Sequence, residues 1–329
     1  MDWKRAYRAE LEDPASRPKL EVLFHGTPLR EELADDVRRG AVLSFPHTYL
    51  EHAAPLHVHV IRALRAANVR RVVALGVLHG AFLPPPFHDT YRLATSCAGE
   101  ASTAAFAQLR GGFIPAEPSW TTPFGSLPLW RICEQDTSVL RRDRRGLLAN
   151  EYSLDTFLAL VRLESEIASL PPLQVLPLFV GPTRAPADGA LATADALASA
   201  LRKIVTADSA VVATGDLVHY GAIYRPLDPA LAAQRVEDAE RHFRDLTRRI
   251  LDRALRHGNQ ETAYQRSVDD LASDQRYILP VIAALLGIPA AARIVSFTLS
   301  DYSVILETPP PCWVASALVV FHRVGSSGR

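Results

Sequence analysis

Short apolar runs alternate along the chain with longer stretches in which apolar residues recur every three or four positions. The first pattern is typical of buried strands and the second of amphipathic helices. The strands we expect cover residues 19–24, 41–45, 71–76, 174–180, 209–214, 292–299 and 313–321. The helices we expect cover residues 55–67, 153–170, 193–207, 230–257 and 279–286. Strands that alternate with helices predict an α/β fold with a central, mostly buried sheet flanked by helices.

Proline-rich segments interrupt this pattern over residues 83–91, 117–129 and 308–312, and we expect ordered loops there. The sequence has no internal repeat and no compositional break that would mark a domain boundary. A length of 329 residues is compatible with one core. We therefore predict a single domain over residues 1–329, with an N-terminal extension over residues 1–18 and a frayed tail over residues 325–329.

The charge of the chain argues against two classes of partner. Lys and Arg total 36, as do Asp and Glu, so the formal net charge is zero. A neutral chain has little electrostatic attraction for nucleic acid or for an anionic membrane. Three cysteines, Cys97, Cys133 and Cys312, are too few and too irregularly spaced for a disulfide framework. The charged first residues predict no signal peptide, and no apolar run is long enough for a membrane span, so we expect a cytoplasmic protein.

Four polar residues follow apolar runs. His47 follows residues 41–45, His79 follows residues 71–76, and Asp216 and His219 follow residues 209–214. In an open α/β sheet, ligands bind beyond the carboxyl ends of the strands. The sequence thus indicates a polar site at this edge of the sheet, and histidine is the commonest protein ligand for metals.

The spacing of Asp216 and His219 places both side chains on one side of a tight turn. There the carboxylate can orient the imidazole and raise its basicity, as a general base requires. An Asp that caps a helix beside an unrelated histidine is the alternative. For His79 the alternative is a loop histidine bonded to the backbone. The histidines with weaker claims to the site are His25, His52, His57 and His59.

Taken together, six segments resemble the Memo-like family, which shares its fold with the class III extradiol dioxygenases and includes the AmmeMemoRadiSam system protein B. The segments occur in the family's order along most of the chain. They are SFPHTY at residues 44–49, GVLHG at 76–80, WTTPFGSLPL at 120–129, NEYSLDTFL at 150–158, LPLFVG at 176–181 and TGDLVHYG at 214–221. The resemblance implies a mononuclear metal pocket with His47 and His79 as ligands and with Asp216 and His219 beside them.

The chain departs from the family at the expected third ligand. Memo-like proteins carry a cysteine before a late helix, whereas this chain has DDLASDQRYILPV at residues 269–281. Asp274 is the nearest candidate, Asp270 shares a helical face with it, and an ungapped alignment favours Tyr277. With Asp274, the site would have two histidines and one carboxylate, as in non-haem Fe(II) oxygenases. The histidine of the family's E-H-S segment is also replaced, by Tyr152.

These expectations combine into a prediction of function. The chain would be a non-haem metal-dependent oxygenase of a small aromatic or phenolic substrate and dioxygen, with Fe(II) favoured over Cu or Zn. His47, His79 and Asp274 would hold the metal, and His219 would act as acid and base, oriented by Asp216. The alternative is a metal-binding or protein-interaction member of the family without turnover, since a shared fold does not imply shared chemistry. A homo-oligomer is compatible with either function. A metal-free hydrolase has no support, because no G-x-S-x-G elbow is present.

Overall fold

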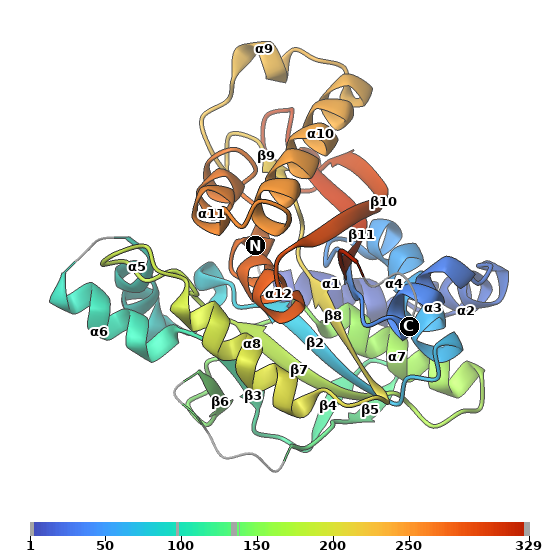
Figure 1. Ribbon diagram of the computed structural model, residues 1–329. Helices are drawn as coiled ribbons and strands as arrows, with labels where there is room; N and C mark the ends of the chain where they lie inside the picture. Colours follow the sequence, from blue (N-terminus) through green and yellow to red (C-terminus); the bar gives the residue numbers. More distant parts are fainter. Residues whose placement is uncertain (1–2, 97–98, 133–136, 138, 326–329) are drawn as a thin grey trace.

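The structure is a computed structural model that describes residues 3–96, 99–132, 137 and 139–325. It has a mixed α/β fold in which helices flank a central mixed sheet (Figure 1). The strands of this sheet are β1 Val42–Phe45, β2 Arg71–Val77, β3 Gly112–Pro115, β6 Leu140–Asp143, β7 Gln174–Val180, β8 Ser209–Thr214, β9 His219–Tyr220, β10 Ala290–Asp301 and β11 Trp313–Arg323. Their order is β10-β11-β1-β8-β2-β7-β3-β6, and β9 pairs with β11.

The middle of the sheet is parallel. Strand β8 pairs in parallel with β1 on one side and with β2 on the other, and β2 pairs in parallel with β7. The flanking pairs β1–β11, β10–β11 and β3–β7 are antiparallel. Strands β1, β8 and β2 therefore lie side by side with their carboxyl ends at the same edge of the sheet.

Helices cover both faces of the sheet, which explains the nearly continuous apolar strands. Along β2, Val73 and Leu75 pack into one apolar cluster, and Val72 and Ala74 pack into the other. The first cluster includes residues of α8 Ala192–Ile204, α10 Val236–Leu255 and α12 Ile278–Leu286. The second includes residues of α2 Ser16–Gly26, α3 Glu31–Arg38, α4 Leu50–Ala66 and α7 Asp155–Ile167.

The remaining elements are shorter and lie around this framework. Strands β4 Ser119–Thr122 and β5 Gly125–Pro128 form a separate hairpin. The other helices are α1 Trp3–Glu12, η1 Gly80–Phe82, η2 Pro85–Phe87, α5 His88–Ser96, α6 Glu100–Leu109, α9 Pro229–Ala232, α11 Gln260–Asp269 and η3 Asp274–Arg276.

The predicted strand over residues 19–24 is wrong, because these residues belong to helix α2. Leu20 and Phe24 are buried one helical turn apart, whereas Val22 between them is 71% exposed. The other predicted strands correspond to β1, β2, β7, β8, β10 and β11. The predicted helix over residues 230–257 is interrupted, since α9 ends at Ala232 and α10 begins at Val236.

Three further segments that we expected to be irregular contain helices or strands. The predicted loop over residues 117–129 contains the β4–β5 hairpin, and α5 begins inside the predicted loop over residues 83–91. The expected N-terminal extension contains α1, which packs against α4 and α7 and buries Tyr7. Residues 326–329 of the expected frayed tail lie outside the described residues.

The structure also bears on the expectations about the cysteines and about membrane-spanning helices. Cys312 is a buried free cysteine, whereas Cys97 and Cys133 lie outside the described residues. Among the helices that the structure describes, none combines the length and the apolar character needed to cross a membrane.

Candidate metal centre

The parallel strands bring the predicted site residues together. His47 comes two residues after β1, His79 two residues after β2, and Asp216 two residues after β8. Because β1, β8 and β2 are neighbours in the sheet, these three side chains emerge at one edge. His219 lies on β9, which pairs with β11 beside them. Asp274 begins η3 and completes the group from a distant part of the sequence.

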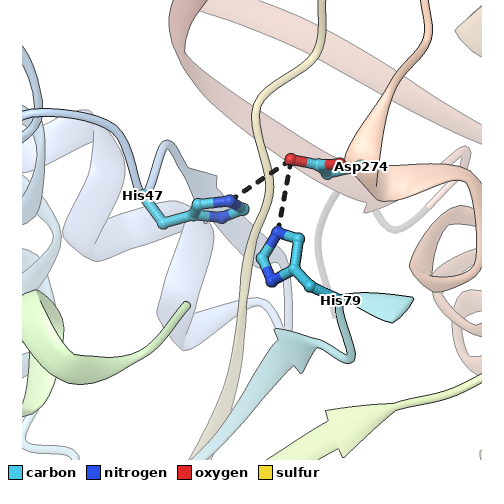
Figure 2. A group of neighbouring side chains, drawn as sticks. All are labelled: His47, His79 and Asp274. Atoms are coloured by element: carbon cyan, nitrogen blue, oxygen red, sulfur yellow. Dashed lines mark ion pairs between the residues drawn. The ribbon is translucent and has the colours of Figure 1, made fainter. Parts of the chain in front are cut away.

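These five side chains converge on one region. The Oδ2 atom of Asp274 lies 3.3 Å from His47 Nε2, 3.6 Å from His79 Nε2 and 3.7 Å from His219 Nε2. The Oδ2 atom of Asp216 lies 3.8 Å from His219 Nε2 and 4.0 Å from His47 Nε2. No side chain of the five is more than 13% exposed. Figure 2 shows the imidazoles of His47 and His79 directed toward Asp274.

The distances of 3.3, 3.6 and 3.7 Å around Asp274 Oδ2 are close to the spacing of metal ligands. Ligand atoms about 2.1 Å from a metal ion lie roughly 3.0–3.4 Å apart in octahedral or tetrahedral geometry. Two groups of three residues have ligand atoms that all lie within 4.8 Å of one another, and both groups contain Asp274. One group adds His47 and His79, and the other adds Asp216 and His219. These buried His and Asp groups can therefore hold a divalent metal ion.

His79 is fixed by the buried carboxylate of Glu151. The Nδ1 atom of His79 lies 3.0 Å from Glu151 Oε1, and the backbone N–H of His79 donates to Glu151 Oε2. The backbone N–H groups of Tyr152 and Ser153 also donate to Glu151. A carboxylate on one imidazole nitrogen and a metal on the other is a common arrangement in metalloproteins.

The remaining nitrogen of His79 is the strongest evidence for a ligand. Its Nε2 atom is buried and has no hydrogen-bond partner among the described residues. A buried polar atom without a partner costs free energy, so such atoms usually have a specific role. Here the atom faces Asp274 and the other imidazoles, and a metal ion would satisfy it.

His219 and His47 present their Nε2 atoms in the same way. His219 Nδ1 lies 3.0 Å from the carbonyl oxygen of Ala272 and can donate to it, which leaves Nε2 directed at the carboxylates. His47 Nδ1 lies 3.4 Å from the hydroxyl oxygen of Thr214. The anchoring of Nδ1 in each ring makes Nε2 the available atom at the centre.

The segment around Asp274 is held against the end of β8. The backbone N–H of Asp274 donates to the carbonyl oxygen of Asp216, and Gln275 donates to the hydroxyl of Ser44. Gly215 allows this close approach, since a Cβ atom there would lie 2.5 Å from Gln275 Cγ and its φ of +152° disfavours other residues. These contacts place Asp274 although it lies far from the histidines in sequence.

The charges of the site reinforce one another. Burial alone would raise the pKa of Asp274, but His219, His47 and His79 outweigh burial and hold this pKa well below its usual range. Burial disfavours a charged His79, but the carboxylates of Glu151 and Asp274 raise the pKa of His79 to about 10. The carboxylates thus favour positive charge at the centre, which a divalent metal ion would also supply.

Aromatic side chains surround this centre. The ring of Tyr152 stacks on His79 with a centroid distance of 4.9 Å, and Tyr224 lies 4.8 Å from the His219 ring. They border a cavity of about 360 Å³, within the usual size range for small-molecule sites. The residues that line it are Tyr7, His47, Thr48, His79, Gly80, Ala81, Phe82, Tyr91, Tyr152, Asp216, His219, Ile223, Tyr224, Ala272, Asp274, Arg276, Tyr302 and Val314.

The structure separates the candidates for the third ligand. Asp274 lies beside the histidines. Asp270 is instead the C-cap residue of α11, and its carboxylate pairs with Arg266 at 2.6 Å. Tyr277 does not line the cavity, and its hydroxyl accepts from Tyr91. The metal role of Asp274 stays a prediction, but its position is the one that this role requires.

The expected orientation of His219 by Asp216 needs a correction. Ala272 anchors His219 Nδ1, and the 3.8 Å between Asp216 Oδ2 and His219 Nε2 is too long for a hydrogen bond. Asp216 instead accepts the backbone N–H of His47 through Oδ1. Burial raises the pKa of Asp216 against the effect of His47 and His219. Asp216 therefore holds the His47 turn and faces the centre alongside His219.

The other histidines lie outside the centre. His57 is buried in α4 and bonds to the carbonyl oxygen of Pro46, and burial lowers the pKa of His57 to about 4. His52 does not line the cavity, although its ring lies 6.0 Å from that of Tyr302. His25 is exposed on α2.

Sequence reasoning missed Glu151, Arg276 and Tyr7. Glu151 lies in a segment whose resemblance to the family was recognised, but a carboxylate that acts through a histidine far away in sequence leaves no spacing to detect. Arg276 lies two residues from Asp274, and Tyr7 lies in a segment that was read as an extension. Only the fold brings Tyr7 and Arg276 to the cavity and Glu151 to His79.

Comparisons with known proteins identify no relative: no family model matches the sequence, and a search of curated proteins finds no match.

Proposed function

We propose that the protein is a non-haem metal-dependent oxygenase that acts on a small aromatic or phenolic substrate, with Fe(II) as the metal. We further propose that its fold is that of the Memo-like proteins and class III extradiol dioxygenases. The resemblance of the six sequence segments supports both proposals. The observation that carries the function is the convergence of three imidazole Nε2 atoms on Asp274 in an aromatic-lined cavity.

In this proposal His47, His79 and Asp274 hold the metal ion. Two histidines and one carboxylate leave coordination positions open, and iron held in this way supplies the activation of dioxygen and of a phenolic hydroxyl group. Glu151 keeps the Nδ1 proton of His79 in place, so that Nε2 stays available. The aromatic walls exclude water and pack against the substrate ring.

His219 is the proposed acid and base. Its Nε2 atom faces the same centre as the metal ligands, and its Nδ1 atom is fixed on the Ala272 carbonyl. In this position His219 can take a proton from a substrate hydroxyl at Nε2 and return it later. Asp216 Oδ2 lies 3.8 Å from that nitrogen.

Paired measurements on variants test these roles. His219→Ala should abolish most oxygen consumption with catechols while it leaves the metal content nearly unchanged. Asp216→Asn should lower turnover less, because the Ala272 carbonyl still orients His219. Metal is measured by elemental analysis after anaerobic purification, and oxygen uptake is measured with a panel of catechols and related phenols.

Two outcomes would contradict the proposal in different ways. Loss of metal from His219→Ala would make His219 a ligand, together with the second group of Asp216, His219 and Asp274. A fully metal-loaded protein that consumes no oxygen with any phenol would favour a metal-binding protein without turnover.

A further inference from the structure

One cationic side chain lines the cavity beside the metal centre. Among the described residues around the cavity, Arg276 is the only lysine or arginine. Its Nη1 atom lies 3.9 Å from Asp274 Oδ1, while Oδ2 of the same carboxylate faces the imidazoles. The guanidinium group therefore lies at the edge of the centre, nearest to Oδ1 of Asp274, the carboxylate oxygen that does not face the histidines.

The guanidinium group is held in place by its surroundings. Its Nη1 atom donates to the Ser273 carbonyl at 2.9 Å, and its central carbon lies 5.1 Å from the Tyr277 ring centroid. The hydroxyl of Tyr91, which also lines the cavity, donates to that of Tyr277. A cation fixed in this way can bind an anion with little loss of side-chain entropy.

Arg276 also has unused capacity for hydrogen bonds. A guanidinium group carries five N–H donors, and it stays charged at every relevant pH. Among the described residues, the Ser273 carbonyl accepts a hydrogen bond from Nη1, and the hydroxyls of Tyr91 and Tyr277 also interact with the guanidinium group. Among the described residues, no carboxylate is paired with Arg276 more closely than Asp274 at 3.9 Å. The remaining donors match the two oxygens of a carboxylate.

We propose that the substrate is an aromatic carboxylate whose carboxylate group binds Arg276 while its hydroxyl group lies at the metal centre. The phenolic part of this inference rests on the proposed function, but the carboxylate part rests on Arg276 alone. Aromatic rings line the cavity beside the imidazoles, since Tyr152 stacks on His79 and the Tyr224 ring lies 4.8 Å from that of His219. Arg276 and the imidazoles line the same cavity, so both groups are available to a ring bound in it.

Anaerobic binding measurements test this inference without turnover. Four probes are titrated calorimetrically into metal-loaded protein: a dihydroxybenzoate, its methyl ester, catechol and benzoate. The wild type should bind the dihydroxybenzoate roughly 10- to 100-fold more tightly than the ester or catechol, as expected for a charge-assisted hydrogen-bonded pair. Arg276→Gln should remove this preference and leave catechol binding within about twofold, and Arg276→Lys should retain part of the preference because it keeps the charge without the planar fork.

Arg225→Gln is the matched control. Arg225 also donates to a backbone carbonyl, that of Asp269 at 2.7 Å, and also covers a tyrosine ring, that of Tyr220 at 5.0 Å, but it does not line the cavity. This variant should keep the preference for the acid. Metal content and thermal unfolding are recorded for each variant.

The outcomes separate this inference from the proposed function. Equal binding of the acid and the ester by the wild type would overturn the carboxylate site while the phenol site stands. Binding of benzoate but not of catechol would overturn the phenolic function while the Arg276 site stands. Equal losses for all probes in Arg276→Gln, or loss of metal, would show that Arg276 serves Asp274 only and would also overturn the inference.

Discussion

Replacement of Glu151 by glutamine tests the support of His79 directly. The carboxylate is buried and accepts the backbone N–H groups of His79, Tyr152 and Ser153 in addition to facing His79 Nδ1. Glutamine has nearly the same shape, but it loses the charge. Its NH₂ group must also face at least one backbone N–H, because it replaces an oxygen that only accepts.

The size of the effect follows from this arrangement. Burial opposes ionisation of Glu151, but His79 and the backbone donors outweigh burial and lower the pKa of Glu151, so the carboxylate is charged in the folded protein. Removal of the charge makes His79 a weaker and less well oriented ligand. Loss of such a partner typically weakens metal binding 10- to 100-fold, or by about 1.4–2.7 kcal/mol.

The assay is an anaerobic competition between the protein and a chelator for one divalent metal. Glu164→Gln is the matched control, since Glu164 is also a buried glutamate, but it pairs with Arg65 away from the centre. That variant should lose stability and keep its metal affinity. If Glu151→Gln binds metal within about twofold of the wild type, the reasoning about His79 is refuted.

The remaining predictions concern a ligand and the response to acid. Asp274→Ala should lower metal affinity at least tenfold, whereas Asp270→Ala should leave it unchanged; equal affinities by chelator competition would remove Asp274 from the site. For His57, burial lowers the pKa from 6.5 to about 4, so the unfolded chain binds the proton more readily and folding stability falls as the pH drops from 6.5 toward 4. The contribution lost over this window is up to about 3 kcal/mol, and His57→Phe should remove it from denaturant unfolding curves while the exposed-site variant His257→Gln should not. An unchanged pH dependence in His57→Phe would contradict the assignment.

The sequence predicted the middle of the sheet well, for a physical reason. Strands β2, β7 and β8 are covered by helices on both faces, so each is a continuous apolar run that stands out from its neighbours. Strand β3 was missed because its four residues begin with Gly112 and end with Pro115, which are typical of turns. Strand β6 was missed because it lies at the edge of the sheet, has only four residues and carries Arg141, Arg142 and Asp143. A short strand at the edge of a sheet buries too little surface to leave a clear pattern.

The error over residues 19–24 has a similar explanation. Leu20, Val22 and Phe24 alternate as in a half-buried strand, yet Leu20 and Phe24 also satisfy the spacing of a helix. The structure resolves this ambiguity because only Leu20 and Phe24 are buried. In so short a run, packing against the neighbouring helices decides between the two patterns.

Most of the candidate site could be predicted from the sequence because its residues directly follow predicted strands. His47, His79 and Asp216 each follow a β-strand that pairs with the next in the sheet. Asp274 was found through the family resemblance, and its distance from the histidines could be learned only from the fold. Glu151 contacts His79, which is remote in sequence, and Arg276 reaches the cavity only through the fold, so no local pattern reveals them.

The most direct test of the central claim is metal analysis of the wild type and of the double variant His47→Ala/His79→Ala. Both proteins are purified anaerobically, and their folding is compared by circular dichroism. We predict one divalent first-row metal ion per wild-type chain and almost none in the folded double variant. Full metal occupancy in the double variant, or a wild type that takes up no divalent metal when it is supplied, would contradict a metal site at His47 and His79.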